Sequence, residues 1–260
     1  MEHQVGAMNT VEQTLILPLF EGVSKPPNRS LTGLSRAGQS QVKAAISSDD
    51  FDGKSGKMIS LWNDDCKVGL VGMGKSSEQK SNSVRDVGAN AFASLNKSHG
   101  KAITVRFTSG WKSSMMTVFA EGMMLRDYKF DKYLSKDDDD DDDGTPYTVT
   151  FQASDRHLDN LTAGCSRVSA IATGVHIARD LGNEPANTLT PMEYASRAKA
   201  FAKGKGNLSV TVLEWDELLE NKMGGLINVG KGSEHKPCMV IWELNAKAKD
   251  GPCPFIVGKG

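Results

Sequence analysis

The sequence predicts an α/β fold, because segments with strand character and segments with helical character alternate along the whole chain. Hydrophobic residues make up 38% of the chain and charged residues 24%, which is the composition of an ordinary globular protein. A chain of 260 residues is long enough for two modest domains, each with its own core. These observations predict two α/β domains in succession.

Five segments in the first part of the chain have strand character, since they are short and rich in apolar residues. They are Thr14–Leu19, Lys57–Trp62, Cys66–Met73, Ala102–Phe107 and Tyr147–Phe151. Between the third and the fourth segment, apolar residues recur every three or four positions from Val84 to Leu95, which predicts an amphipathic helix. The same spacing predicts a second helix over Ser114–Asp127.

A run of seven aspartates, Asp137–Asp143, follows Lys136 just before the last of these strands. Adjacent like charges repel one another and bury no apolar surface, so the run is predicted to be a disordered, solvated surface loop. Loose calcium binding is the alternative. A defined calcium site needs ligands held at fixed positions around a turn, however, and a bare run supplies neither.

From Asp155 to about Leu181 the apolar residues again step by three or four, which predicts one long amphipathic helix. A helix in this position is suited to connect two domains rigidly. We therefore predict an amino-terminal domain over 1–150, a connecting helix over 151–181 and a second domain over 182–260.

The predicted second domain begins with a helix-start signal. Thr190 and Glu193 have the spacing of a capping box, and Pro191 occupies the first helical position between them. This helix is predicted to run to Lys203 and to stop at Gly204. The elements expected after it are a strand over Leu208–Leu213, a short helix over Asp216–Asn221, and strands over Cys238–Leu244 and Pro254–Val257. Because nothing follows to cover the last strand, we expect this domain to be incomplete.

Bulk composition argues against several classes of function. The net charge of −1 gives no excess of basic residues that would indicate a nucleic-acid or membrane-surface partner. No apolar run approaches the roughly 18 residues of a membrane span, and Leu15–Phe20 is too short for a secretory signal. The four cysteines form no CxxC pair and are expected to be free thiols. A cytoplasmic protein is predicted.

The segment Gly69–Ser76 (GLVGMGKS) fits the phosphate-loop pattern GxxxxGK[ST] at every position. In a true phosphate loop a buried strand ends before the first glycine, and a helix opens directly after the loop. Here Gly69–Met73 itself has strand character, and the next helical pattern begins only near Val84. Nucleotide binding is therefore kept as a minor alternative.

No other catalytic pattern is present. The histidines His3, His99, His157, His176 and His235 are scattered, without an HExxH or HxH pair that would indicate zinc. No GxSxG elbow occurs, and no cysteine has a histidine at motif spacing. These residues assign no catalytic and no cofactor-binding position in this chain.

The segment Ala178–Pro191 (ARDLGNEPANTLTP) closely resembles the ARDL-N-PAN-LTP signature of the leucyl (cytosol) aminopeptidase family. Further resemblances to this family occur in the expected order along the chain. They are Glu121–Gly122 with Tyr128–Tyr133 (YKFDKY), Met223–Leu226 through Gly230–Ser233, and Pro254–Gly260, which ends in VGKG. The phosphate-loop pattern then corresponds to the end of a VG-GK strand in the amino-terminal domain of the family.

The resemblance implies a fold and a chemistry. The fold would be a macro-like, three-layer α/β amino-terminal domain, a connecting helix and a truncated α/β metallopeptidase domain. Family members are metal-dependent exopeptidases that remove N-terminal residues, leucine preferentially, with two divalent ions, zinc or manganese. One ligand in the family is the lysine of VGKG, which matches Lys259. A lysine amine ligates a metal only when its pKa is lowered.

The other metal carboxylates, a second lysine and an arginine lie beyond VGKG in the family. We therefore expect this chain alone to bind the metals poorly and to be inactive. The partners implied are peptide substrates and further copies in a homo-hexamer, with neither a membrane nor a nucleic acid. The alternative is a non-catalytic fragment of this family that serves in oligomerisation or binding, including the DNA contact of some members.

Overall fold

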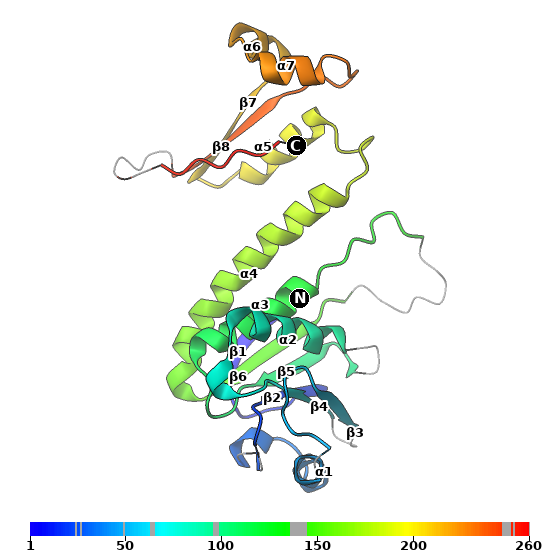
Figure 1. The fold of residues 1–260 in the computed structure, drawn as a ribbon, viewed down its shortest axis with the longest axis vertical. Helices are drawn as coiled ribbons and strands as arrows, with labels where there is room; N and C mark the ends of the chain where they lie inside the picture. The colour runs from blue at the N-terminus through cyan, green and yellow to red at the C-terminus, as the bar shows by residue number, and fades with distance from the viewer. Residues whose placement is uncertain are drawn as a thin grey trace. The chain divides into compact units, whose positions relative to one another are not determined.

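The computed structural model describes the chain except for Ser24, Pro27, Asp49, 63–65, 96–98, 136–144, 246–250, Pro252 and Gly260. The aspartate run Asp137–Asp143 therefore lies outside the described residues. The chain divides into two compact units, Met1–Asp180 and Leu181–Gly260 (Figure 1). Each unit is described separately below.

The first unit is built on a six-stranded sheet of order β1-β6-β5-β2-β4-β3. Only β3 is antiparallel to its neighbour β4, whereas all other pairs are parallel. The strands are β1 (Glu2–Ala7), β2 (Thr14–Leu19), β3 (Met58–Trp62), β4 (Lys67–Gly72), β5 (Ala102–Arg106) and β6 (Thr148–Ala153). The five predicted strands are confirmed within one or two residues at each end. The edge strand β1 was not predicted.

Helices cover both faces of this sheet. They are α1 (Arg36–Ser47), α2 (Ser81–Ala93), α3 (Ser113–Arg126) and α4 (Asp155–Asn183), with short 3₁₀ turns at Asn28–Leu31 and Ser76–Glu78. The predicted helices α2, α3 and α4 are confirmed. Helix α1 was missed, although its buried residues Val42, Ala45 and Ile46 have the i, i+3, i+4 spacing of an amphipathic helix.

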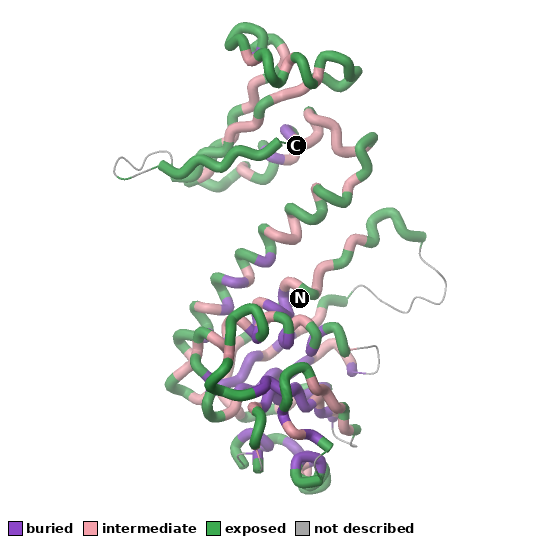
Figure 2. The backbone as a smooth tube through the Cα atoms, in the orientation of Figure 1, coloured by how far each residue is buried: buried purple, intermediate pink, exposed green. Residues whose placement is uncertain are grey.

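Alternation of side chains along the strands produces two cores, one on each face of the sheet. In β2, Leu15 and Leu17 pack with α1, whereas Ile16 packs with α2, α3 and α4 on the opposite face. The buried residues concentrate along the strands (Figure 2). This three-layer α/β arrangement with a mostly parallel sheet confirms the predicted fold class.

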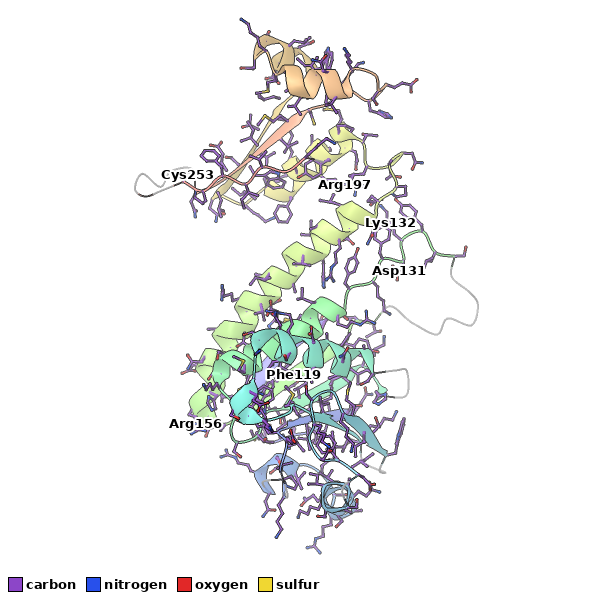
Figure 3. The ribbon with its side chains drawn as sticks, viewed as in Figure 1. Phe119, Asp131, Lys132, Arg156, Arg197 and Cys253 are labelled. Carbon is purple, nitrogen blue, oxygen red and sulfur yellow. The ribbon has the colours of Figure 1, made fainter. Side chains whose placement is uncertain are left out.

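Helices α2 and α3 pack closely because each presents a glycine to the backbone of the other. A Cβ atom at Gly88 would overlap the carbonyl of Phe119, the α3 residue labelled in Figure 3. A Cβ atom at Gly122 would likewise overlap the carbonyl of Arg85 on α2. The absence of a side chain at these two positions therefore sets the distance between the helices.

The guanidinium of Arg106 is fully buried at the carboxyl end of β5. Its Nε donates to Oε1 of Gln152 at 2.8 Å, and its Nη1 donates to the carbonyls of Ser30 (3.0 Å) and Thr32 (2.6 Å). Its Nη2 donates to the carbonyl of Thr10 at 2.7 Å. One side chain thus joins β5, β6 and two loops.

Burial lowers the pKa of Arg106 to about 10, because the charged form loses hydration, and the nearby Cys66 partly offsets this change. The guanidinium is still charged near neutral pH at that value. Its carbonyl acceptors are what make a buried charge tolerable at this position.

The second unit contains α5 (Pro191–Ala202), β7 (Leu208–Leu213), α6 (Trp215–Glu220), α7 (Gly224–Gly230) and β8 (Met239–Leu244). Strands β7 and β8 pair antiparallel, and Phe201 of α5 contacts Trp242 of β8 with ring centroids 5.9 Å apart. The predicted elements are confirmed except for one strand and the missed α7.

The predicted strand Pro254–Val257 is wrong, because these residues have no regular structure. Phe255, Ile256 and Val257 are 87%, 98% and 93% exposed, so their apolar side chains pack against almost nothing. An apolar run forms a strand only where a neighbouring strand pairs with its backbone and a packing surface covers its side chains.

Within the described ranges, no helix has the length and apolar content needed to cross a membrane.

We expect Gly88→Ala and Gly122→Ala to destabilise the first unit, because the added methyl group meets backbone atoms that cannot rotate away. Overpacking of this kind costs about 1–3 kcal/mol. Gly174→Ala on α4 is the matched control, since its added Cβ meets no described heavy atom within 4 Å apart from the adjacent backbone of its own helix. It should be neutral or stabilising by up to about 1 kcal/mol. Urea unfolding measures all three, and equal effects would contradict the packing argument.

We expect Arg106→Lys to lower the melting temperature markedly. A lysine cannot reach four acceptors in different directions, and each buried carbonyl left unpaired costs about 1–3 kcal/mol. Arg126→Lys at the exposed end of α3 is the control and should change the melting temperature little. Similar melting curves for the two variants would show that the Arg106 contacts contribute no net stability.

Candidate functional site

The segment singled out by its sequence, Ala178–Pro191, forms the end of α4 and the loop that leads into α5. Thr190 is the N-cap of α5, and its hydroxyl accepts a hydrogen bond from the amide of Glu193 at 3.3 Å. The carbonyl of Pro185 accepts from the amides of Thr188 and Leu189, both at 2.9 Å. The predicted helix start is therefore confirmed, although only the Thr190 half of the predicted capping box forms among the described contacts, and the loop before it is a hydrogen-bonded turn.

A buried carboxylate fixes this loop to α5. Arg197, labelled in Figure 3, donates from Nη1 to Glu184 at 2.9 Å and from Nε to Glu193 at 2.8 Å. The side chain of Glu184 is only 3% exposed, whereas those of Arg197 and Glu193 are 32% and 43% exposed. The hydrogen bonds to Glu193 and Glu184 raise the pKa of the Arg197 guanidinium.

The sequence analysis did not identify this arrangement. The pair Glu193–Arg197 has the i,i+4 spacing of a helical ion pair and was visible in principle. Glu184 lies thirteen residues from Arg197, across a turn, and no periodic pattern links the two.

The start of β8 is attached to the same helix. The thiol of Cys238 donates to the carbonyl of Pro191 at 3.3 Å. Burial raises the pKa of this thiol, and the charge of Glu214 raises it further. The raised pKa makes this thiol less reactive than a cysteine with an unperturbed pKa.

Lys259, the predicted metal ligand, is an exposed residue in the irregular segment after β8. In the part of the chain that the structure describes, no three histidine, cysteine, aspartate or glutamate side chains cluster in a way that could hold a metal ion. One lysine without carboxylate neighbours is not a donor set for a divalent ion. The residues present therefore do not fit the implied metals, and the role of Lys259 stays a prediction.

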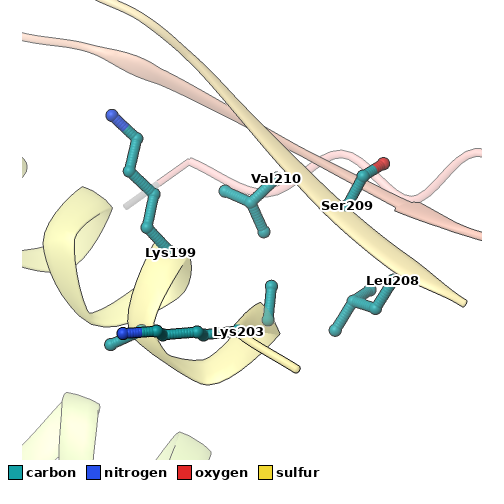
Figure 4. Close-up of a pocket in the computed structure, with 7 residues that line it drawn as sticks. Lys199, Lys203, Leu208, Ser209 and Val210 are labelled. Carbon is teal, nitrogen blue, oxygen red and sulfur yellow. The ribbon is translucent and has the colours of Figure 1, made fainter. Parts of the chain in front are cut away.

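A hollow of about 430 Å³ lies between α5 and β7 in the second unit. Lys199 of α5, Lys203 directly after that helix, and Leu208, Ser209 and Val210 of β7 line it (Figure 4). Its walls are aliphatic and its charged groups are exposed lysines. This lining offers no acid–base pair and no nucleophile with a base, so it carries no hydrolytic chemistry by itself.

The backbone amides within the phosphate-loop pattern already donate hydrogen bonds to carbonyls of the protein itself. The amides of Gly72, Met73 and Gly74 donate to the carbonyls of Lys57, Leu19 and Gly53 at 2.8, 2.9 and 2.9 Å. Lys75 pairs with Glu78 at 3.2 Å, and α2 begins only at Ser81. A phosphate loop needs these amides free to surround the phosphates, so the geometry contradicts the nucleotide alternative.

Two family models match the chain in order. The amino-terminal domain of the cytosol aminopeptidase family matches residues 16–137, and the catalytic domain of the same family matches residues 176–260. Among curated proteins, the probable cytosol aminopeptidase of Protochlamydia amoebophila is 28% identical over 95% of this chain and 49% of its own length. That of Rhizobium rhizogenes is 36% identical over 75% of this chain and 39% of its own length.

Solved structures share the fold. A mutant of tomato leucine aminopeptidase matches with a TM-score of 0.75 at 21% identity, over 96% of this chain and 52% of its own. The bottromycin maturation enzyme BotP in complex with Mn matches with a TM-score of 0.64 at 22% identity, over 88% of this chain and 44% of its own. The chain thus spans about half, or less, of the length of the relatives that it matches.

We expect Glu184→Gln to lower the melting temperature more than Glu193→Gln does, although both remove a carboxylate from the same arginine. Breaking a pair whose acid is buried is costly, whereas exposed ion pairs contribute little. At about 1 M NaCl the Glu193→Gln effect should vanish and the Glu184→Gln effect should persist. Thermal unfolding by circular dichroism at low and high salt measures both, and equal shifts would refute a special role for Glu184.

Proposed function

The chain belongs to the cytosol aminopeptidase family, and from this premise we propose that it acts in a metal-dependent aminopeptidase that releases N-terminal residues from peptides. The order of the two family models along one chain is the observation that carries this proposal. The capped turn before α5 supports it, because the family signature coincides with a defined structural element.

The cofactor that we propose is a pair of divalent ions, zinc or manganese, with Lys259 as one ligand. The BotP structure in complex with Mn supports manganese. The described side chains hold no ligand cluster, so we assign no reaction step to this chain's own residues. The missing ligands would come from sequence that corresponds to the other half of the relatives.

Leucine at the peptide N-terminus is the proposed substrate preference, as the resemblance implies. We further propose a homo-hexamer in the cytoplasm, with no membrane or nucleic-acid partner. The net charge of −1 supports the last point, because binding to phosphate backbones relies on clustered basic side chains.

A second function is favoured by the absence of a metal-ligand cluster among the described residues. On this alternative the chain is a non-catalytic module of the family that serves assembly or binding. The chimera described below distinguishes the two: activity that depends on Lys259 supports the aminopeptidase, whereas a folded chimera without activity supports the module.

The proposal is tested by fusing this chain to the part of the Rhizobium rhizogenes relative that follows its matched region. We expect the chimera to hydrolyse leucine p-nitroanilide with Mn²⁺ and to lose activity with a chelator. We expect Lys259→Met to abolish activity, whereas Lys199→Met, an exposed lysine on α5, leaves it unchanged. The 260-residue chain alone should be inactive. A folded chimera that is indifferent to Lys259→Met contradicts the assignment.

A further inference from the structure

Two neighbouring parallel strands of the first unit lead to helices on opposite faces of the sheet. Strand β2 leads to α1, which packs in one core, and β5 leads to α3, which packs in the other. Helices α1 and α3 therefore lie on opposite sides of the sheet (Figure 1). In open parallel sheets, ligands bind in the crevice outside the strand ends at such a point.

A cavity of about 260 Å³ lies at this position. One wall is the segment after β2, with Phe20, Glu21, Val23 and Lys25, and the other includes Thr108 and Ser109 after β5. Pockets for drug-sized ligands span roughly 300–1,000 Å³. The cavity is therefore suited to a smaller molecule.

Opposite charges line this one small space without pairing with each other. Within the described residues, Glu21 and Lys25 form no ion pair, although both line the cavity. Lys54 lies close to Glu21, but its ammonium bonds Asp52 at 3.0 Å. The pKa of Lys54 is raised chiefly by its hydrogen bond to Asp52 and only slightly by the charge of Glu21. Both cavity charges thus remain available to a ligand.

The rest of the lining combines hydroxyl groups with an apolar wall. The described residues provide no hydrogen-bond partner for the hydroxyls of Thr108 and Ser109. The ring of Phe20 is held by Trp111, with ring centroids 5.2 Å apart, and Val23 adds an aliphatic surface. A ligand for this site carries both charges and a small apolar group.

We propose that this cavity binds a free α-amino acid with an aliphatic side chain. The carboxylate of the amino acid binds Lys25 and the hydroxyls of Thr108 and Ser109, and its ammonium group binds Glu21. The aliphatic side chain packs on Phe20 and Val23. This binding needs neither a metal nor a peptide, so it is independent of the aminopeptidase proposal.

The test is calorimetric titration of the full chain with L-leucine, without added metal. We expect saturable binding with one site. 4-Methylpentanoate lacks the ammonium group and isopentylamine lacks the carboxylate, and each should bind at least about tenfold more weakly, because one charge-assisted contact is lost. The proposal is overturned if either analogue binds as tightly as leucine. It is also overturned if no binding is measured at about 10 mM leucine, a concentration well above a millimolar dissociation constant.

Variants then locate the site. Glu21→Gln and Lys25→Met should each weaken leucine binding about tenfold, while Glu12→Gln and Lys43→Met, exposed side chains outside the lining, should not change it. Circular dichroism checks that all four variants fold. Binding that survives both cavity variants unchanged overturns the assignment to this cavity. Failure of the aminopeptidase assay leaves this result unaffected, so the two proposals fail separately.

Discussion

The first unit depends on one buried charge, the guanidinium of Arg106. A cation without water must be surrounded by acceptors, and here these are Gln152 and the carbonyls of Thr10, Ser30 and Thr32. Two loops, one before β2 and one after it, are therefore folded around one side chain. Ser30 follows the cavity residue Lys25 in the same loop, and Arg106 lies just before the cavity residue Thr108, so the Arg106 contacts join the two segments that also supply the cavity walls.

The strands of the first unit were predictable because burial on both faces leaves an apolar run that local sequence shows directly. Strand β2, whose six residues are all buried, is the clearest case. Strand β1 was not, since it lies at the edge of the sheet and begins with three polar residues, Glu2–Gln4, so that it contains no apolar run. Helix α7 was missed for a related reason: it begins with two glycines, and none of its residues is buried.

The candidate site was predictable only in its local parts. The cap of α5 needs only residues three positions apart, and the structure confirms it. The contact between Glu184 and Arg197 depends on the direction in which the turn returns the chain, which no local pattern encodes. The prediction of a strand over Pro254–Val257 was wrong for the same reason, since a strand there requires a neighbouring strand from a distant part of the sequence. Lys259, in the same segment, remains a prediction.

The phosphate-loop pattern shows why a motif must be judged by its free hydrogen-bonding groups. Gly72 and Gly74 are required here because a Cβ at the first would overlap the carbonyl of Lys54, and the second has φ +69°. Those are the same demands that a phosphate loop makes of glycine, namely close approach and a left-handed backbone. The difference is that the approaching group is the protein's own 53–55 segment. The carbonyls of Gly53, Lys57 and Leu19 already accept the amide hydrogens that a phosphate would need. The spacing of the glycines alone therefore identifies only a tight turn at the end of a strand. Whether that turn binds an anion depends on whether its backbone amides are free to donate hydrogen bonds.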